Sequence, residues 1–394
     1  MRNIALTFLG CFTILAACSN SDDAERPVTP VPTGDVTIYT TTSSLTRDLA
    51  RDAVNFSSKD NLAPTTITID PTELYQTMDG FGVAITGATC FNLFQMRPED
   101  RHAFLTETFS DKDGFGFSYI RISIGCSDFS LSEYTCCDTK GIENFALQSE
   151  EKEYILPILK EILAINSSIK IIAAPWTCPK WMKVKSLKDL TPLEKWTDGQ
   201  LNPAYYQDYA TYFVKWVQAF KAEGIDIYAV TPQNEPLNRG NSASLYMSWE
   251  EQRNFVKSAL GPKFKAAGLT AKIYAYDHNY DYSDIEAERN YPGKIYEDGD
   301  AAQYLAGAAY HNYGGDREEL LNMHETYPEK ELLFTETSIG TWNSGRDLSK
   351  RLLEDMKEVA LGTVNNWCKG VIVWNLMLDN DRAPNREGGC QTCY

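Results

Sequence analysis

Short apolar runs rich in β-branched residues alternate with longer amphipathic segments from about Thr66 onward. Such runs are typical of parallel strands that are buried on both faces and covered by helices. The sequence holds eight of them: Phe81–Gly87, Tyr119–Gly125, Lys170–Trp176, Ile227–Glu235, Lys272–Asn279, Ala306–Tyr313, Leu332–Ser338 and Val371–Leu378. We therefore expect eight parallel strands.

The segments between these runs show helical periodicity. Within Tyr205–Phe220, aromatic residues recur at steps of three and four, which gives a helix one apolar face. Further helices are predicted over Glu151–Ile165, Trp249–Lys265 and Leu348–Val364. Eight strand–helix units in an α/β chain close most naturally as a (β/α)8 TIM barrel. A doubly wound open sheet is the alternative.

The first residues have the pattern of an export signal: Arg2 precedes an apolar run that ends in Leu15-Ala-Ala-Cys18. This ending resembles a bacterial lipobox, in which Cys18 is lipidated. We predict a lipoprotein signal peptide at residues 1–18, a tether at 19–65 and a catalytic domain at 66–394, with 66–78 as a possible part of a truncated β side domain. An ordinary cleavage site with a chance Cys is the alternative.

These features predict an exported lipoprotein at the outer membrane or cell surface of a Gram-negative bacterium, which contacts the membrane only through its lipid. The net charge of -17 and pI near 4.8 repel nucleic acid and anionic lipid, so a neutral ligand is favoured. Hydrophobic residues make up 43% of the chain and aromatic residues 12%, enough for a large core and for stacking surfaces. We expect a monomer.

The chain has 10 Cys, of which those beyond Cys18 would lie in an oxidising compartment. The closely spaced pairs Cys136-Cys137 and Cys390-Gln-Thr-Cys393 could form bridges or half of a metal site, but no His stands near either with zinc-finger spacing. No metal is predicted. Buried, inert thiols are expected at Cys90, Cys126, Cys178 and Cys368.

Polar residues gather where the predicted strands end, which is the end of a TIM barrel that carries the chemistry. The strand ends read Arg121 to Asp128, Pro175-Trp176, Gln233-Asn-Glu235, Asp277-His-Asn279, His311-Asn-Tyr313, Glu336 and Trp374-Asn375. Any one of these residues could be an ion-pair partner, a cap or a packed ring. Their recurrence at one end of seven strands predicts an active site.

Two of these strand ends deliver a single Glu each, within Thr231-Pro-Gln-Asn-Glu-Pro236 and within Leu333-Phe-Thr-Glu-Thr337. A retaining glycosidase needs two carboxyl groups about 5 Å apart, one to protonate the leaving oxygen and one to attack the anomeric carbon. Glu235 and Glu336 are the candidates. This chemistry needs no metal and no organic cofactor.

From about Gln76 onward the chain resembles glycoside hydrolase family 30, retaining (β/α)8 enzymes that include glucosylceramidases and microbial β-1,6-glucanases. The resemblance rests on an ordered set of motifs: Asp79-Gly-Phe-Gly-Val-Ala-Ile-Thr86, Arg121 to Ser130, Ala174 to Lys183, Gln233-Asn-Glu-Pro236, His311-Asn-Tyr313, Thr335-Glu336 and Trp374-Asn375. Two departures stand out. Gly87 replaces an Asp that often follows the first motif, and the family's usual C-terminal β-sandwich is largely missing from this chain.

The resemblance assigns roles to individual residues. Glu235 matches the general acid/base, which has to hold a proton, and Glu336 matches the nucleophile, which has to stay ionised. Arg121 would hold the nucleophile charged and aimed, and Asn234 would donate to the sugar 2-hydroxyl. The remaining expected contacts are His311 and Tyr313 beside Glu336, Asp128 at outer sugar hydroxyls, and Trp176 and Trp374 against the ring, with core packing as the alternative for both Trp.

Within the family, Asp128 to Asp138 and the segment Pro384 to Gly389 look most similar to the bacterial β-1,6-glucanases. The expected activity is endo-hydrolysis of β-1,6-linked glucan with retention. Exo-acting β-glucosidase or glucosylceramidase activity is the nearest alternative, and a xylanase is a less similar one. A glycan-binding lipoprotein without turnover is an alternative of a different class, although a binder has no need for two carboxylates at strand ends.

Overall fold

The structure, a computed structural model, describes residues 32–57, 66–280, 285–342, 345–387 and 389–393. The predicted signal peptide and Cys18 lie outside the described residues. The chain forms two compact units, Met1–Ile67 and Thr68–Tyr394, and each is described here by itself. Within the described part of the chain, every helix is too short or too polar to cross a bilayer.

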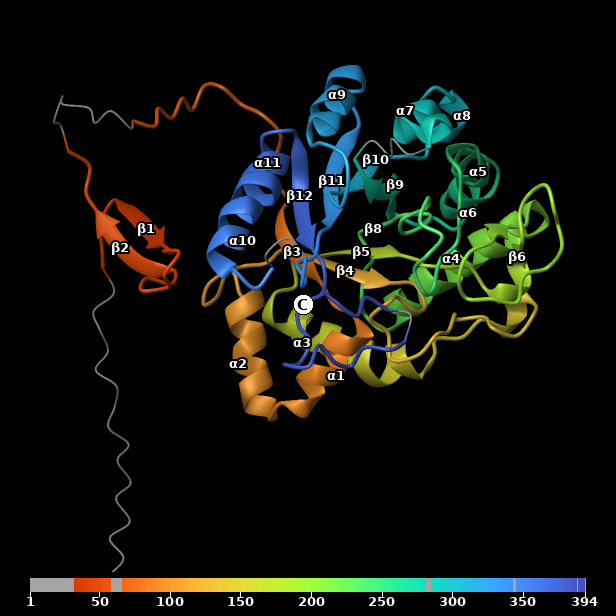
Figure 1. Ribbon diagram of the computed structural model, residues 1–394, viewed down its shortest axis with the longest axis horizontal. Coiled ribbons are helices and arrows are strands. Elements are labelled where there is room, and N and C mark those ends of the chain that lie inside the picture. Colours follow the sequence, from red (N-terminus) through yellow and green to blue (C-terminus); the bar gives the residue numbers. More distant parts are fainter. Residues whose placement is uncertain (1–31, 58–65, 281–284, 343–344, 388, 394) are drawn as a thin grey trace, which may run out of the picture. The chain divides into compact units, whose positions relative to one another are not determined.

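The larger unit is built on a closed barrel of eight parallel strands (Figure 1). Neighbours in the barrel follow the chain order β3, β4, β5, β8, β9, β10, β11, β12 and back to β3. Their bounds are Gly80–Ala84, Tyr119–Ser123, Lys170–Ala174, Ala229–Val230, Lys272–Asn279, Gly307–His311, Glu331–Glu336 and Cys368–Val373. The predicted (β/α)8 fold is confirmed, and the open sheet is excluded.

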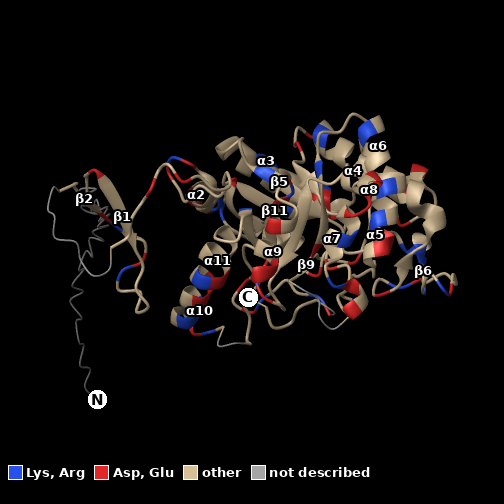
Figure 2. Cartoon of the chain, turned by 90° about the horizontal axis from the view of Figure 1, so that it is seen from above, with Lys and Arg blue, Asp and Glu red and all other residues tan. Residues whose placement is uncertain are grey.

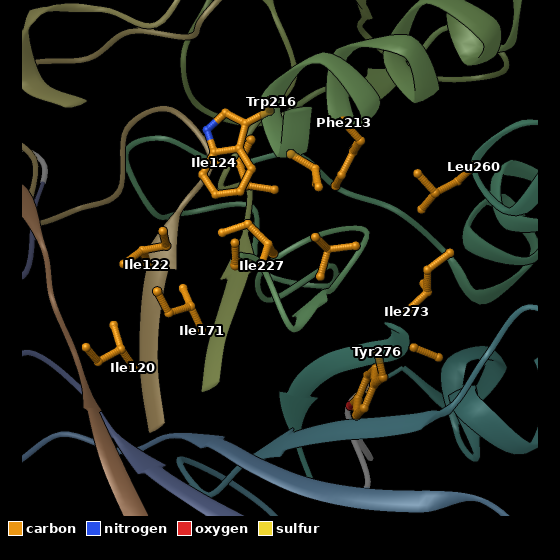
Figure 3. Packing of buried hydrophobic residues seen from close by; sticks show 14 of the residues in the cluster. Ile120, Ile122, Ile124, Ile171, Phe213, Trp216, Ile227, Leu260, Ile273 and Tyr276 are labelled. Carbon is orange, nitrogen blue, oxygen red and sulfur yellow. The ribbon is translucent and has the colours of Figure 1, made fainter. Parts of the chain in front are cut away.

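Alternation along each strand explains why the barrel closes. One set of strand side chains fills the interior, among them Tyr119, Ile172, Tyr274, Leu333 and Ile372. The alternate set points outward under the helices. Figure 3 shows this outer layer, in which Ile120 and Ile122 of β4, Ile171 of β5 and Ile273 of β9 lie with Phe213 and Trp216 of the covering helix. Both faces of the strands are therefore buried in apolar contact, as their composition predicted.

The crossovers are helical, and several helices contain one wide π turn. The bounds are α1 Gly87–Gln95, α2 Pro98–Phe109, α3 Leu156–Ile165, α4 Tyr206–Ala222, α5 Trp249–Phe255, α6 Gly261–Ala266, α7 Tyr291–Tyr296, α8 Gly299–Ala302, α9 Glu318–Thr326, α10 Leu348–Glu354 and α11 Leu361–Val364. The π turns Glu151–Ile155, Val256–Leu260 and Asp355–Ala360 join or extend neighbouring helices. The helices predicted from periodicity at these places are confirmed, whereas α1, α2, α7, α8 and α9 were not predicted.

The smaller unit contains an antiparallel pair, β1 (Val36–Thr40) and β2 (Ala50–Val54). The sequence predicted only a tether over residues 19–65, because this stretch lacks a sustained apolar pattern. Side chains of the pair are mostly exposed, including Ile38, Tyr39 and Val54. The hairpin thus forms without a core of its own among the described residues. A second short pair, β6 (Lys183–Val184) and β7 (Gln200–Leu201), lies in the larger unit.

Charged residues of both signs are mixed on the outer helices. Figure 2 shows basic and acidic positions interspersed along α10 and the π turn Asp355–Ala360 that follows it. There Arg351 pairs with Glu354 and Asp355, at 2.9 Å each. The net negative charge of the chain therefore does not prevent local pairing on this face.

Candidate active site

A cavity of about 350 Å³ opens at the carboxyl ends of the barrel strands and contains both candidate Glu residues. Glu235 lies shortly after β8, and Glu336 is the last residue of β11. A carboxylate oxygen of Glu235 lies within 4.8 Å of a carboxylate oxygen of Glu336. This separation leaves room for a direct attack on an anomeric carbon but none for an intervening water, which needs carboxyl groups about 6.5–9.5 Å apart.

The cavity is lined by acids, amides, one His and aromatic rings. Five of the residues predicted from sequence are among them: Asp128, Glu235, Tyr313, Glu336 and Trp374. The others are Asn238, Asn241, His278, Asn279, Trp342, Cys390 and Cys393. A second hollow of about 500 Å³, beside Trp249 and Asp298, lies at α5, α7 and α8 and holds no such pair of strand-end carboxylates.

Arg121 of β4 is fully buried and ties three strand ends together. Its Nη1 donates to Glu336 Oε2 at 2.6 Å, and its Nη2 donates to Asn234 Oδ1 at 2.6 Å and to Asp277 Oδ2 at 2.9 Å. The planar guanidinium can hold several acceptors in fixed directions, which an ammonium group cannot do. The predicted contact with the nucleophile candidate is present. Because Asn234 Oδ1 accepts from Arg121, its amide nitrogen is the end left to donate elsewhere.

Asp277 on β9 is the shared partner at the centre of this network, and sequence reasoning gave it no role. Thr231 and Thr335 both donate to it at 2.6 Å, in addition to Arg121. Burial raises its pKa, but the Arg121 charge and the His311 contact more than offset that and hold the pKa well below its usual range. Asp277 is therefore a buried, permanent anion beneath the two Glu residues.

His311 of β10 bridges Asp277 and Glu235. Its Nε2 lies 3.1 Å from Asp277 Oδ1 and its Nδ1 lies 3.4 Å from Glu235 Oε1. Burial lowers the pKa of His311, but the carboxylates of Glu336, Asp277 and Glu235 raise it to about 9. The imidazole is thus a cation below that pH. His278, 3.9 Å from Glu235 Oε1, has its pKa lowered to about 4, chiefly by burial, and is neutral.

Glu235 lies in a turn and has a φ of 44°, in the left-handed region. Several hydrogen-bond donors surround its carboxyl group. Asn238 Nδ2 and Asn241 Nδ2 both donate to Oε2 at 2.8 Å, while His311 faces Oε1. Neither Asn was predicted, because amides in a loop after a strand carry no distinctive sequence signal. Burial raises the pKa of Glu235, but the His311 contact, the charge of the nearby His residues and the Asn238 amide bring it down to about 2.

Glu336 has the opposite electrostatic environment. Burial and the Glu235 charge raise its pKa, against the lowering effect of His311 and Arg121. Tyr313 also donates to its Oε1, at 3.0 Å. The surroundings of the free site therefore favour the charge on Glu235, which is the opposite of the order that the first chemical step needs, and the assignment of roles stays a prediction. Two carboxyls this close titrate as a coupled pair.

Two Trp residues form a stacked pair under the site. Trp176 and Trp374 have ring centroids 5.2 Å apart, and the Arg121 guanidinium lies 5.1 and 5.6 Å from the two centroids. Trp374 lines the cavity, whereas Trp176 is buried and, among the described residues, is not part of the lining. A direct sugar contact is thus supported for Trp374, and core packing is the better interpretation of Trp176.

Asp128 places a buried carboxyl at the cavity wall. Burial, reinforced by the charges of Glu336 and Glu235, raises its pKa to about 8. Its Oδ1 is buried and has no hydrogen-bond partner among the described residues. A neutral carboxyl with an unused oxygen is suited to exchange hydrogen bonds with sugar hydroxyls.

The space beside Gly87, the position at which the resemblance implied an Asp, is occupied by a side chain from another part of the chain. A Cβ at Gly87 would lie 1.9 Å from Glu150 Oε1. The Glu150 carboxylate therefore occupies the volume beside this position, and its Oε2 accepts from the Leu131 backbone at 2.9 Å. A carboxyl group from another segment thus lies beside position 87, and a side chain there would collide with it.

Cys390 and Cys393 form a disulfide at the cavity wall, which answers the pairing that the sequence left open. Cys136 and Cys137, in contrast, are buried free thiols. The thiols of Cys90, Cys126, Cys178 and Cys368 are buried and free as expected.

Glu235, His311 and Glu336 could each offer one ligand atom to a cation, since these atoms lie within 4.8 Å of one another. However, Glu336 already pairs with the Arg121 guanidinium, and His311 carries its own positive charge because its pKa is raised to about 9. A metal ion would have to compete with both. The sequence-based prediction that the chain uses no metal and no cofactor stays a prediction.

Paired carboxylates at this distance, at the strand ends of a (β/α)8 barrel, define a glycoside hydrolase. The model of the glycosyl hydrolase family 30 TIM-barrel domain matches residues 78–389. The chain belongs to glycosyl hydrolase family 30, as its motifs predicted.

Several relatives align along most of the chain. A putative glucosylceramidase 4 of Caenorhabditis elegans is 30% identical over 385 residues, which cover 92% of this chain and 71% of the relative. An endo-1,6-β-D-glucanase of Trichoderma harzianum is 33% identical over 335 residues, 81% of this chain and 64% of the relative. A solved structure of an endo-β1,6-glucanase superposes with a TM-score of 0.90 at 86% identity, over 92% of this chain and 79% of that one.

Proposed function

We propose that this chain is an endo-acting, retaining glycosidase that cleaves β-1,6-linked glucan. The observation that carries the reaction type is the approach of the Glu235 and Glu336 carboxylates to within 4.8 Å of each other. The observation that supports the substrate is the 86% identical endo-β1,6-glucanase structure. Both agree with the activity predicted from the motifs.

The first chemical step joins the substrate to the protein. A Glu336 oxygen attacks the anomeric carbon and forms a glycosyl ester, while Glu235 transfers its proton to the departing glycosidic oxygen. In the second step Glu235, now a carboxylate, takes a proton from water, and the resulting hydroxide attacks the same carbon and breaks the ester. Two inversions give net retention.

Arg121, Tyr313 and His311 are the residues that prepare Glu336 for attack. Each donates to the nucleophile or lies beside it, at 2.6, 3.0 and 4.0 Å respectively. Because the first step needs the proton on Glu235, sugar binding has to reverse the order of the two pKa values found in the free site.

The negative charge of the protein is compatible with a neutral substrate. A glucan chain is neutral, so it avoids the repulsion that an anionic polymer would meet from the chain's net charge of -17. Asp128 and the Asn234 amide are placed to bind hydroxyls of the sugar at the cleavage point, and Trp374 offers an apolar ring face.

Digestion of pustulan, a β-1,6-glucan, tests the proposal. We expect short oligosaccharides early in the reaction, with the β anomer formed first in the proton NMR spectrum, and little release from laminarin or xylan. Glucose as the only early product would favour an exo-acting glucosidase or glucosylceramidase. Initial α anomer would contradict retention, and no release from any sugar by folded protein would favour a glycan-binding protein.

Substitution of each Glu separates the two roles. Glu336→Ala should abolish turnover, and azide should restore bond cleavage with inverted configuration, because the small anion enters from the opposite face. Glu235→Ala should spare the first step for substrates with good leaving groups, which need little protonation. Equal losses on good and poor leaving groups would contradict the acid/base assignment.

Membrane attachment through Cys18 is proposed from the sequence pattern. Labelling of cells with radioactive palmitate should mark the wild-type chain and leave a Cys18→Ser variant unmarked. The label in both chains would contradict this site of lipidation.

A further inference from the structure

Arg386, in the segment that follows β12, has a guanidinium that contacts two other loops at the active-site rim. Its Nη2 donates to the backbone oxygens of Ser127 and Ser242, the latter at 2.6 Å. Its Nη1 donates to Ser242 Oγ at 3.3 Å and lies 3.2 Å from Glu133 Oε1. The side chain is only 14% exposed, so these contacts are shielded from water.

Two of the contacted residues, Ser242 and Glu133, also bind each other. Ser242 Oγ donates to Glu133 Oε1, so Arg386, Glu133 and Ser242 form a closed triangle of polar contacts. The contact at Ser242 is therefore directional, and Ser242 is held through both its backbone and its side chain. A single ammonium group could not reach the same set of acceptors in fixed geometry.

The loop fixed at Ser242 carries a donor to the acid/base. Asn241, the residue directly before Ser242, donates its Nδ2 to Glu235 Oε2 at 2.8 Å. Asn238 donates to the same oxygen from the other side of the loop. With both amide donors on Oε2 and His311 Nδ1 3.4 Å from Oε1, the carboxyl plane of Glu235 is set.

Arg386 itself stands on a segment that is braced internally. Asn385 Nδ2 donates to the Cys390 backbone oxygen at 2.6 Å, and Gln391 Nε2 donates to Asn385 Oδ1 at 2.9 Å. The Cys390–Cys393 disulfide closes the same segment. Arg386 therefore presents its guanidinium from a defined position rather than from a loose loop.

We propose that Arg386 is a positioning residue for the general acid/base, because it fixes Ser242 and thereby holds the Asn241 amide on Glu235. This inference rests on the proposed function. Arg386 lies on the loop after the eighth barrel strand. The proposal gives this residue a part in proton transfer at Glu235, which follows the fourth barrel strand.

The consequence is specific to proton donation. If Arg386 is lost, the Asn241 donor becomes mobile and the carboxyl plane of Glu235 is no longer fixed toward the leaving group. General acid catalysis contributes about 10²–10⁴-fold, so partial misplacement should cost about tenfold for leaving groups that need protonation. Leaving groups that depart without a proton should be nearly unaffected.

Leaving-group dependence is therefore the test. We would measure kcat/KM for a series of aryl β-gentiobiosides of graded phenol acidity, each variant at its own pH optimum so that altered protonation of Glu235 does not enter. Arg386→Ala and Asn241→Ala should both steepen the dependence, with about tenfold loss at the poorest leaving group and less than about twofold at the best. The dependence of kcat/KM on leaving-group acidity should be no steeper in the double variant than in Asn241→Ala alone.

Arg382→Ala is the matched control, because Arg382 lies on the same segment and, among the described residues, its guanidinium donates only to the Gln391 backbone oxygen of that segment. It should leave the dependence unchanged. If Arg386→Ala does not fold, Arg386→Lys carries the same test, since it keeps the charge and loses the fork. An unchanged dependence in a folded Arg386 variant, or steepening that multiplies in the double variant, would overturn the proposal.

The same series keeps the two levels of inference apart. Glu235→Ala should itself give the steepest dependence. If it does not, the acid/base assignment fails regardless of Arg386. If Glu235→Ala behaves as expected and Arg386→Ala does not, only the positioning role is lost.

Discussion

Arg121→Gln would remove the one guanidinium that links Glu336, Asp277 and Asn234. The change keeps a polar side chain but leaves the buried carboxylates of Asp277 and Glu336 without their shared cation. Removing one partner of a buried ion pair costs about 3–5 kcal/mol, mostly because a charge stays buried and uncompensated.

The structure places the expected loss at the lower end of that range. Asp277 would keep Thr231, Thr335 and His311 as partners, and Glu336 would keep Tyr313. We therefore expect the free energy of unfolding to fall by about 3 kcal/mol at pH 7. Without Arg121 the pKa values of both carboxyls rise, and a raised carboxyl pKa contributes stability at low pH that is lost as the pH increases. The gap to wild type should hence be wider at pH 8 than at pH 5.

Guanidinium chloride unfolding of both proteins at pH 5, 7 and 8 measures this gap. Arg101→Gln is the control, because Arg101 forms a partly exposed pair with Glu161 at 2.9 Å, for which about 1 kcal/mol or less is expected at any of these pH values. Equal losses for the two variants, or a gap for Arg121→Gln that does not change with pH, would refute the electrostatic account of the network.

Two further predictions follow from single groups. Burial raises the pKa of Glu150 to about 7, so the stability that protonated Glu150 contributes is present below its ordinary pKa and is lost as the pH rises through 7. The free energy of unfolding of Glu150→Gln should therefore exceed that of wild type by about 1–3 kcal/mol at pH 8 and differ little from it at pH 4.5. An equal difference at both pH values would contradict this prediction. Tyr313→Phe removes the hydroxyl that donates to Glu336 at 3.0 Å and should lower kcat/KM on pustulan about tenfold with an unchanged melting temperature, whereas full activity would show that the contact does not assist attack.

Much of the barrel could be predicted because its strands are buried on both faces and therefore read as continuous apolar runs. The fifth barrel strand was predicted with its observed bounds, Lys272–Asn279. The fourth was predicted as Ile227–Glu235 but pairs only over Ala229–Val230. Beyond that point the backbone leaves the ladder and turns, as the positive φ of Glu235 shows. An apolar run marks a buried strand but does not mark where its pairing stops.

The helices that escaped prediction are short or weakly amphipathic. Helix α1 begins shortly after the end of β3, and α2 begins at Pro98. The apolar positions of both helices are too few to show a period. Their formation depends on packing against the barrel, which a local pattern does not contain.

The two Glu residues could be identified because each stands at a predicted strand end, where a closed barrel brings side chains together. Arg121 lies within β4 and takes its predicted role from the resemblance to the family. Asp277 was noted at such an end but received no role, since its importance depends on Arg121 and His311 reaching it at once. The order of pKa values was predicted from the reaction and not from the surroundings. Asn238 and Asn241, whose amides donate to Glu235, lie in a loop whose conformation no local signal fixes.

The central claim is that Glu336 attacks the sugar and carries it as an ester. A dinitrophenyl 2-deoxy-2-fluoro-β-gentiobioside tests this directly, because the fluorine slows both steps while the good leaving group lets the first proceed. The account predicts a stable mass increase of one fluorinated gentiobiosyl group, mapped by peptide sequencing to Glu336. A label on Glu235 or on another residue, or steady turnover with no labelled protein at any time, would contradict it.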